Sequence, residues 1–294
     1  MTSLRILLPL VLTLLAVALV NLQMRRRGLV PPRFQAETDP ETGVAAADTT
    51  GPRFRAALAG LVLAVVLYLS VLSPIGLIGL DLTPDLDALH ALQLFTLHGF
   101  FAVALLAWYA LGFAPSAGVA TSLSSQFGLR AERVLREIGI GVLAGAGIWV
   151  GVVALLLLLS GLVMLFGGAE ALPQEPPGLV LWIAGLSVWT RIAVSLSAGF
   201  FEEIFFRGFL QPRVGIAVST IFFSLAHLSY DQPFMLVGVT VLSLLFAWLV
   251  LWRQSIWAAA SAHAMFDMIQ LVIVIPLLTG FLDTAPGSEL LVVF

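Results

Sequence analysis

Long apolar runs separated by short polar breaks dominate the hydropathy pattern of this chain. A helix that crosses a bilayer needs roughly 20 predominantly apolar residues, and the runs that approach this length predict about eight spans. The predicted spans are residues 4–22, 56–80, 92–113, 138–166, 179–212, 214–230, 234–252 and 255–281. The pattern therefore predicts an all-α fold, a polytopic transmembrane helix bundle.

Composition supports a membrane protein. The 294 residues are 60% hydrophobic and 11% charged, with a mean hydropathy of +1.05, which leaves too little polar surface to face water. The expected partner is the lipid bilayer. The chain has no cysteine, which excludes disulfides and thiolate metal sites, and a net charge of -3 gives no indication of a nucleic-acid partner.

The arginines orient the predicted bundle, because basic residues near span ends are retained on the cytoplasmic side. Eleven of them fall in alternate connections: Arg25, Arg26, Arg27, Arg33, Arg53, Arg55, Arg130, Arg133, Arg136, Arg213 and Arg253. This distribution predicts a multipass protein of the cell membrane with both termini outside, and Arg5 alone contradicts it. All 14 basic residues are arginine, a composition bias that favours a bacterial cytoplasmic membrane.

Two adjacent carboxylates, Glu202 and Glu203, lie inside one of the most apolar stretches. A charged side chain at bilayer depth costs about 3 kcal/mol, so such groups usually face a protein interior or a water-filled cavity. His227, His263 and Asp267 repeat this anomaly. We counted about 1.5 Å per residue from the predicted cytoplasmic turns. This count places Glu202, His227, His263 and Asp267 at one depth, roughly 15 to 20 Å above one membrane face. The sequence therefore predicts one buried polar cavity.

Residues four apart share a helix face, whereas adjacent residues diverge by about 100°. Glu203 is therefore expected to pair with Arg207, which leaves Glu202 free for a reactant. His263 and Asp267 are expected to share a face in the same way. Phe223 lies one turn before His227 and is expected to form a wall beside its imidazole.

A carboxylate and two histidines without cysteine favour chemistry on activated water. Glu202 and His227 are the candidate general-base pair, and the second histidine is the candidate that stabilises an oxyanion. The other two histidines receive no role: His98 has no polar companion in its own span and is interpreted as a packing residue, and His90 as a loop residue.

Three motifs carry a family resemblance: Glu202-Glu203-x-x-x-Arg207, Phe223-x-x-x-His227 and His263-x-x-x-Asp267. In this order and at these separations they resemble the motifs of the CAAX protease and bacteriocin-processing (CPBP, or Abi) family, across about a quarter of the chain. The resemblance implies an intramembrane glutamic endopeptidase, a hydrolase similar to the type II CAAX prenyl endopeptidases, that cleaves a membrane-associated peptide or protein.

The resemblance also implies residue roles. Glu202 and His227 would activate the water, His263 and Asp267 would form the oxyanion hole, and Glu203 and Arg207 would support the site. The family commonly has asparagine where this chain has Asp267. An ionised aspartate cannot donate a hydrogen bond, so Asp267 must be protonated or must act by orienting the imidazole of His263.

The same patterns divide the chain into five segments. Residues 1–27 form a predicted signal-anchor span, and residues 28–55 a flexible cytoplasmic linker whose composition does not favour folding. Residues 56–178 form accessory transmembrane helices. Residues 179–281 form the CPBP-like catalytic core, and residues 282–294 the C-terminal tail.

The sequence is also compatible with three other functions. No cofactor is expected, although Glu202, His227 and His263 would satisfy a three-ligand catalytic zinc. A non-catalytic immunity or scaffold protein with the same fold would retain the motifs without cleaving anything. A proton-coupled transporter would also bury Glu, His and Arg.

Overall fold

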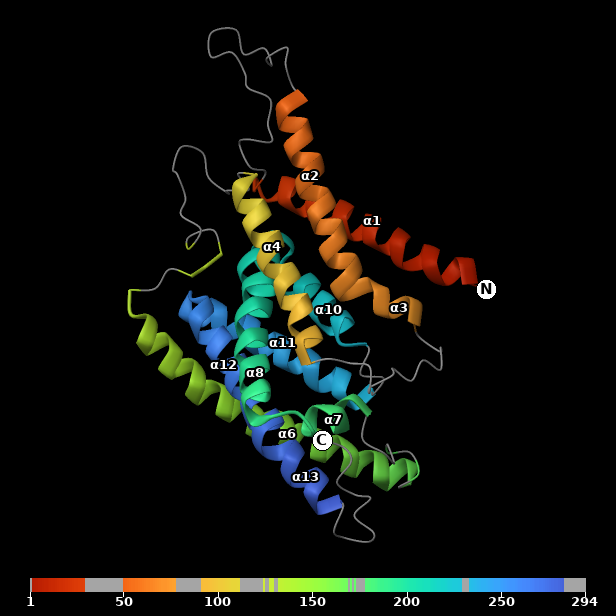
Figure 1. Cartoon of the computed structure of the whole chain (residues 1–294), viewed down its shortest axis with the longest axis vertical. Helices are drawn as coiled ribbons and strands as arrows, with labels where there is room; N and C mark the ends of the chain where they lie inside the picture. The colour runs from red at the N-terminus through yellow and green to blue at the C-terminus, as the bar shows by residue number, and fades with distance from the viewer. Residues whose placement is uncertain are drawn as a thin grey trace.

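The computed structural model describes residues 2–29, 50–77, 91–111, 124, 127–129, 132–168, 170, 172, 178–228 and 233–282. Every regular element in these ranges is helical and none is a strand, which confirms the predicted all-α class (Figure 1). The predicted C-terminal tail beyond residue 282 lies outside the described residues.

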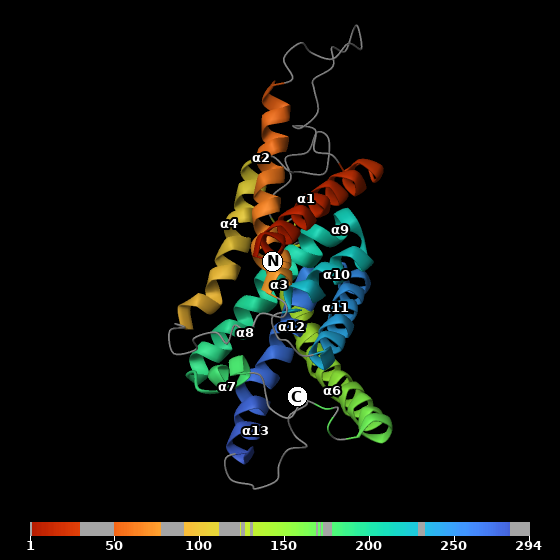
Figure 2. The same cartoon turned by 90° about the vertical axis from the view of Figure 1, so that its right-hand side faces the viewer.

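The N-terminal helices form one end of the molecule (Figures 1 and 2). They are α1 (Thr2–Arg26), α2 (Thr50–Leu67) with the π-helical turn η2 (Tyr68–Leu72) and α3 (Ser73–Leu77), the 3-10 turn η3 (Ala91–Phe95) and α4 (Thr96–Ala110). The first six residues of α2, 50–55, belong to the expected linker, and residues 30–49 of that linker lie outside the described residues. α4 packs against α2 on one side and against α8 on the other.

The C-terminal half supplies the remaining helices. They are α6 (Val134–Gly167), α7 (Gly178–Ala184), α8 (Val188–Glu203) with the π-helical turn η5 (Ile204–Leu210) and α9 (Gln211–Val214), α10 (Ile216–Ala226), α11 (Pro233–Arg253), and α12 (Ile256–Met268) with the π-helical turn η7 (Ile269–Val274) and α13 (Ile275–Leu282). α12 contacts α6, α8 and α11, so it lies at the centre of this half.

Six of the eight predicted spans correspond to helices that are long and apolar enough to cross a membrane. Within the described residues these are Leu7–Arg26, Arg53–Gly76, Leu92–Ala110, Val134–Gly167, Phe234–Arg253 and Ile256–Thr279. The chain is therefore a multipass membrane protein.

The prediction of a single span over residues 179–212 is wrong. α7 ends at Ala184, and a new helix starts at Val188 because the Ser187 hydroxyl caps it by accepting a hydrogen bond from the Thr190 N–H at 3.1 Å. The helix that follows is less apolar than the six spans because it carries five charged residues, which are Arg191, Glu202, Glu203, Arg207 and Arg213. The charged side chains that make this segment a candidate site also make it less hydrophobic than a simple membrane span.

The predicted sixth span, residues 214–230, is also corrected. Its helix, α10, has 11 residues. At about 1.5 Å per residue it covers about 16 Å, roughly half of the 30 Å hydrocarbon core. Gly215 separates α9 from α10 with a φ of 88°, a conformation that glycine adopts without steric penalty.

Small residues let α12 approach its neighbours closely. A Cβ at Gly145 of α6 would overlap the backbone of Ala262, and a Cβ at Gly199 of α8 would lie 2.6 Å from the carbonyl oxygen of Ala260. A Cβ at Gly147 would meet nothing within 4 Å. One face of α6 is therefore specialised for contact with α12.

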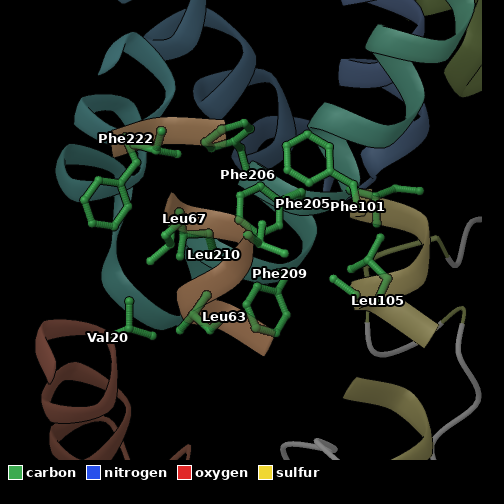
Figure 3. Packing of buried hydrophobic residues seen from close by; sticks show 14 of the residues in the cluster. Val20, Leu63, Leu67, Phe101, Leu105, Phe205, Phe206, Phe209, Leu210 and Phe222 are labelled. Atoms are coloured by element: carbon green, nitrogen blue, oxygen red, sulfur yellow. The ribbon is translucent and has the colours of Figure 1, made fainter. Parts of the chain in front are cut away.

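Aromatic stacking joins α4 to the turn η5 (Figure 3). The ring centroids of Phe101 and Phe205 lie 4.6 Å apart with 12° between their planes, and those of Trp108 and Phe209 lie 3.9 Å apart with 4° between them. Every residue of η5 is buried. The accessory helix α4 is thus rigidly packed on the helix that carries the two glutamates.

Candidate active site

Glu203, at the C-terminal end of α8, is the centre of a buried charge cluster. Its side chain is 0% exposed, and its Oε1 lies 3.0 Å from Nη1 of Arg207, whose side chain is 1% exposed. The contact has the geometry of an ion pair but not of a hydrogen bond. Arg207 also donates from Nη2 to the carbonyl oxygen of Ser243 at 3.3 Å. The pairing expected from the four-residue spacing is confirmed.

The same Glu203 oxygen contacts His263 on α12. The distance from Nδ1 of His263 to Oε1 of Glu203 is 2.9 Å. Because a carboxylate only accepts hydrogen bonds, Nδ1 of His263 carries the proton. Glu203 therefore ties the arginine of the first motif to the histidine of the third.

The other nitrogen of His263 faces Asp267. Nε2 lies 3.5 Å from Oδ2 of Asp267, one helical turn further along, so the shared face expected from the sequence is confirmed. The His263 ring also stacks on Phe246 with a centroid distance of 5.0 Å. His263 is held by carboxylates at both nitrogens and by an aromatic ring on one face.

His227 follows directly after the last residue of α10. Its Nδ1 lies 2.7 Å from the carbonyl oxygen of Phe223, and its ring centroid lies 4.6 Å from that of Phe223. The expected aromatic wall is therefore present. The Phe223 ring also receives the guanidinium of Arg207 over its face at 4.2 Å, a cation–π distance. One phenylalanine thus packs against members of two motifs.

Glu202 contacts a histidine to which the sequence assigned no role. Its Oε1 lies 3.6 Å from Nε2 of His98 on α4, and Nδ1 of His98 lies 2.8 Å from the hydroxyl oxygen of Ser197 on α8. The interpretation of His98 as a packing residue is therefore wrong. Its companions lie on another helix, about 100 residues away in the chain. No pattern within its own span could have revealed them.

Glu202 also interacts electrostatically with His227 and His263. Its second oxygen, Oε2, is buried and has no hydrogen-bond partner among the described residues. Helices α4, α8, α10 and α12 thus deliver one carboxylate and three imidazoles to a common polar region.

A cavity of about 140 Å³ opens beside this region. It is lined by His227, His263 and Asp267 together with apolar side chains that include Phe223 and Phe246. That volume accommodates several water molecules. Glu202 is not among the lining residues.

The sequence suggested metal ligation only for Glu202, His227 and His263. In the part of the chain that the structure describes, no three or more His, Cys, Asp or Glu side chains are grouped so that they could hold a metal ion. His263 is instead engaged by Glu203 and Asp267.

Part of the chain matches a known protein family. Residues 183–269 match the family model described as "Type II CAAX prenyl endopeptidase Rce1-like". This segment is an Rce1-like domain. All seven residues of the three motifs lie inside the Rce1-like domain, whereas α4 and His98 lie outside it.

A relative in Bacillus subtilis (strain 168), "Uncharacterized protein YpbD", is 29% identical over 79 residues. The alignment covers 26% of this chain and 42% of the relative, so the chain spans less than half of that protein. The comparison with solved structures found no match. Similarity to a known family is thus shown for residues 183–269, the Rce1-like domain.

Proposed function

We propose that the chain is an intramembrane endopeptidase that hydrolyses a peptide bond with water activated by Glu202 and His227. The observation that carries the proposal is the convergence of α8, α10 and α12. These three helices bring two glutamates, two histidines and an aspartate together inside a multipass bundle, and both histidines and the aspartate line a cavity. Burying so many ionisable groups in a membrane protein is costly, and such groups mark functional sites by default.

The proposed reaction uses His227 as an acceptor. Since Nδ1 donates to the carbonyl of Phe223, the neutral imidazole has its acceptor lone pair on Nε2. A water between this nitrogen and Glu202 loses a proton to the pair as its oxygen bonds to the carbonyl carbon of the substrate. The proton then passes to the amide nitrogen and the C–N bond breaks, which releases a carboxylic acid and an amine.

The proposed oxyanion site is His263. Glu203 holds its Nδ1 proton, so the ring is oriented with Nε2 toward Asp267 and the cavity. An imidazolium in this position would donate to the oxygen that becomes negative in the transition state. Pre-aligned donors of this kind are worth several kcal/mol in a water-poor site. Asp267 acts in this proposal by orienting and balancing the charge of His263.

The substrate class that we propose is a peptide or protein end that is anchored in the membrane. The name of the family points to prenylated protein ends. The cavity is lined mainly by apolar side chains and lies within the bundle, which favours a substrate that is already in the bilayer. A quenched peptide with and without a farnesyl group distinguishes a requirement for the prenyl chain from a requirement for the sequence alone.

Comparative peptidomics tests the proposal. A strain that lacks the gene would be complemented with the wild type, with Glu202→Gln, or with Glu132→Gln, a matched control at an exposed glutamate. We expect membrane-derived fragments with the wild type and Glu132→Gln but not with Glu202→Gln. If the strain with Glu202→Gln gave the same fragments as the strain with the wild type, this result would instead support a non-catalytic immunity or scaffold protein.

The zinc alternative is tested on purified protein. We expect cleavage of an identified peptide to persist after exhaustive chelation, with no stoichiometric metal in the preparation. A loss of cleavage that zinc restores would replace the proposed mechanism by a metal-dependent one.

A further inference from the structure

His98 lies outside the Rce1-like domain, yet it contacts the carboxylate proposed to be the general base. It belongs to α4, its side chain is 7% exposed, and its Nε2 lies 3.6 Å from Oε1 of Glu202. This distance is too long for a hydrogen bond but is that of an electrostatic contact. Catalytic contacts of this length commonly tighten when substrate binds.

The protonation of His98 follows from its partners. A carboxylate has no proton to donate unless it is neutral, so the favourable arrangement has a proton on Nε2 of His98 directed at Glu202. Nδ1 lies 2.8 Å from the hydroxyl of Ser197, which donates to a neutral ring or accepts from a charged one. In both states Ser197 fixes the ring with Nε2 toward Glu202.

Packing holds the imidazole in that orientation. The His98 ring stacks on Phe201 at a centroid distance of 6.3 Å with 15° between the planes, and Phe95 meets it edge-on at 6.4 Å. One turn further along α4, Phe101 stacks on Phe205 of η5 (Figure 3). These ring contacts therefore fix the distance between α4 and the glutamate-bearing helix α8 on both sides of the contact between His98 and Glu202.

We propose that His98 is a positioning residue for Glu202, so that an accessory helix completes the catalytic site. The proposal rests on the proposed function. His98 holds Oε1 of Glu202, and Oε2, which has no protein hydrogen-bond partner in the described residues, is left to contact the reacting water. The Ser197, His98 and Glu202 side chains form a chain that links α4 to α8 beside the general base.

Substitutions at His98 separate positioning from packing. His98→Leu removes both ring nitrogens, whereas His98→Gln places an amide N–H near the original Nε2 position. On a quenched peptide that carries the cleavage sequence found by peptidomics, we expect His98→Leu to lower kcat about 10- to 100-fold, the range typical of residues that orient a catalytic ligand, with KM unchanged. His98→Gln should recover most of kcat.

Tyr109→Phe is the matched control on the same helix. It removes a hydroxyl from an exposed residue and leaves the rings that stack α4 on η5 unchanged. We expect its kcat to equal that of the wild type. Equal kcat for His98→Leu and the wild type, with Glu202→Gln inactive, would overturn the inference and leave the proposed function intact. Retained cleavage by Glu202→Gln would overturn the proposed function itself.

A second measurement does not depend on the activity or folding of the leucine variant. The chain has only four histidines, so histidine-selective ¹⁵N labelling gives four pairs of ring signals, and the pair missing from His98→Gln belongs to His98. We expect Glu202→Gln to shift the His98 ring signals and Glu132→Gln to leave them in place. Unchanged His98 signals in Glu202→Gln would overturn the contact on which the inference depends.

Discussion

Nδ1 of His227 lies 2.7 Å from the carbonyl oxygen of Phe223, one helical turn earlier. A carbonyl only accepts, so this contact selects the tautomer that carries its proton on Nδ1. We therefore expect the neutral His227 ring to show a protonated Nδ1 and an unprotonated Nε2 in ¹⁵N spectra of histidine-labelled protein.

The control for this prediction is His227→Gln, which identifies the His227 signals by their loss. A dominant Nε2–H tautomer would contradict the role of His227 as a proton acceptor at the cavity, because the nitrogen that is proposed to take the proton would then already carry one.

Arg207 and Glu203 are predicted to stabilise the fold as a unit. Removing one member of a buried ion pair leaves an uncompensated charge and typically costs about 3–5 kcal/mol. Arg207→Met should therefore lower the free energy of unfolding by that amount, measured by denaturant unfolding in detergent. The double variant Glu203→Gln/Arg207→Met should be clearly less destabilised than the sum of the single variants, and simple additivity would show that the two side chains are not coupled.

Asp267 is predicted to orient His263 through an acceptor oxygen. Asparagine also presents such an oxygen, so Asp267→Asn should retain cleavage within about 10-fold, whereas Asp267→Ala should lower kcat about 10- to 100-fold. The comparison is made by kcat on the same peptide. Should alanine be tolerated as well as asparagine, the contact of 3.5 Å between Asp267 and His263 has no catalytic role.

Gly145 and Gly147 form a matched pair on α6. A Cβ at Gly145 would overlap the backbone of Ala262, whereas a Cβ at Gly147 meets nothing within 4 Å. Overpacking of this kind costs roughly 1–3 kcal/mol, so Gly145→Ala should lower the unfolding free energy by about that much. Gly147→Ala should be neutral or slightly stabilising. Equal effects of the two substitutions would show that α6 and α12 do not pack as closely as described.

Patterns within single helices were predicted well from the sequence. The pairs Glu203–Arg207 and His263–Asp267 and the wall formed by Phe223 all follow from four-residue spacing, which backbone hydrogen bonding enforces locally. Six spans followed from hydropathy because the bilayer demands long apolar helices. The fifth predicted span was wrong because the Ser187 cap starts a new helix inside it. The sixth was wrong because its helix, α10, has only 11 residues and ends at Ala226.

Counting depth along the chain predicted that several helices share one polar cavity, but it did not predict which side chains from different helices touch. His98 meets Glu202 only because stacked aromatic rings dock α4 on η5, and no periodicity within α4 encodes its partner. The contact of Glu203 with His263 likewise depends on the close approach of α8 and α12 at Gly199. Tertiary packing, not local spacing, decides which polar residues meet.

The shortness of α10 would restrict which polypeptides the proposed endopeptidase can cleave. This helix covers about 16 Å, so His227 lies near the middle of the hydrocarbon layer when α10 starts at a membrane face. An extended chain advances about 3.3 Å per residue, so about five residues must thread inward before a peptide bond meets the imidazole. A substrate whose folded domain ends fewer than about five residues from the scissile bond would be excluded by steric clash. The length of unfolded chain next to the scissile bond would therefore select the substrates of the proposed reaction.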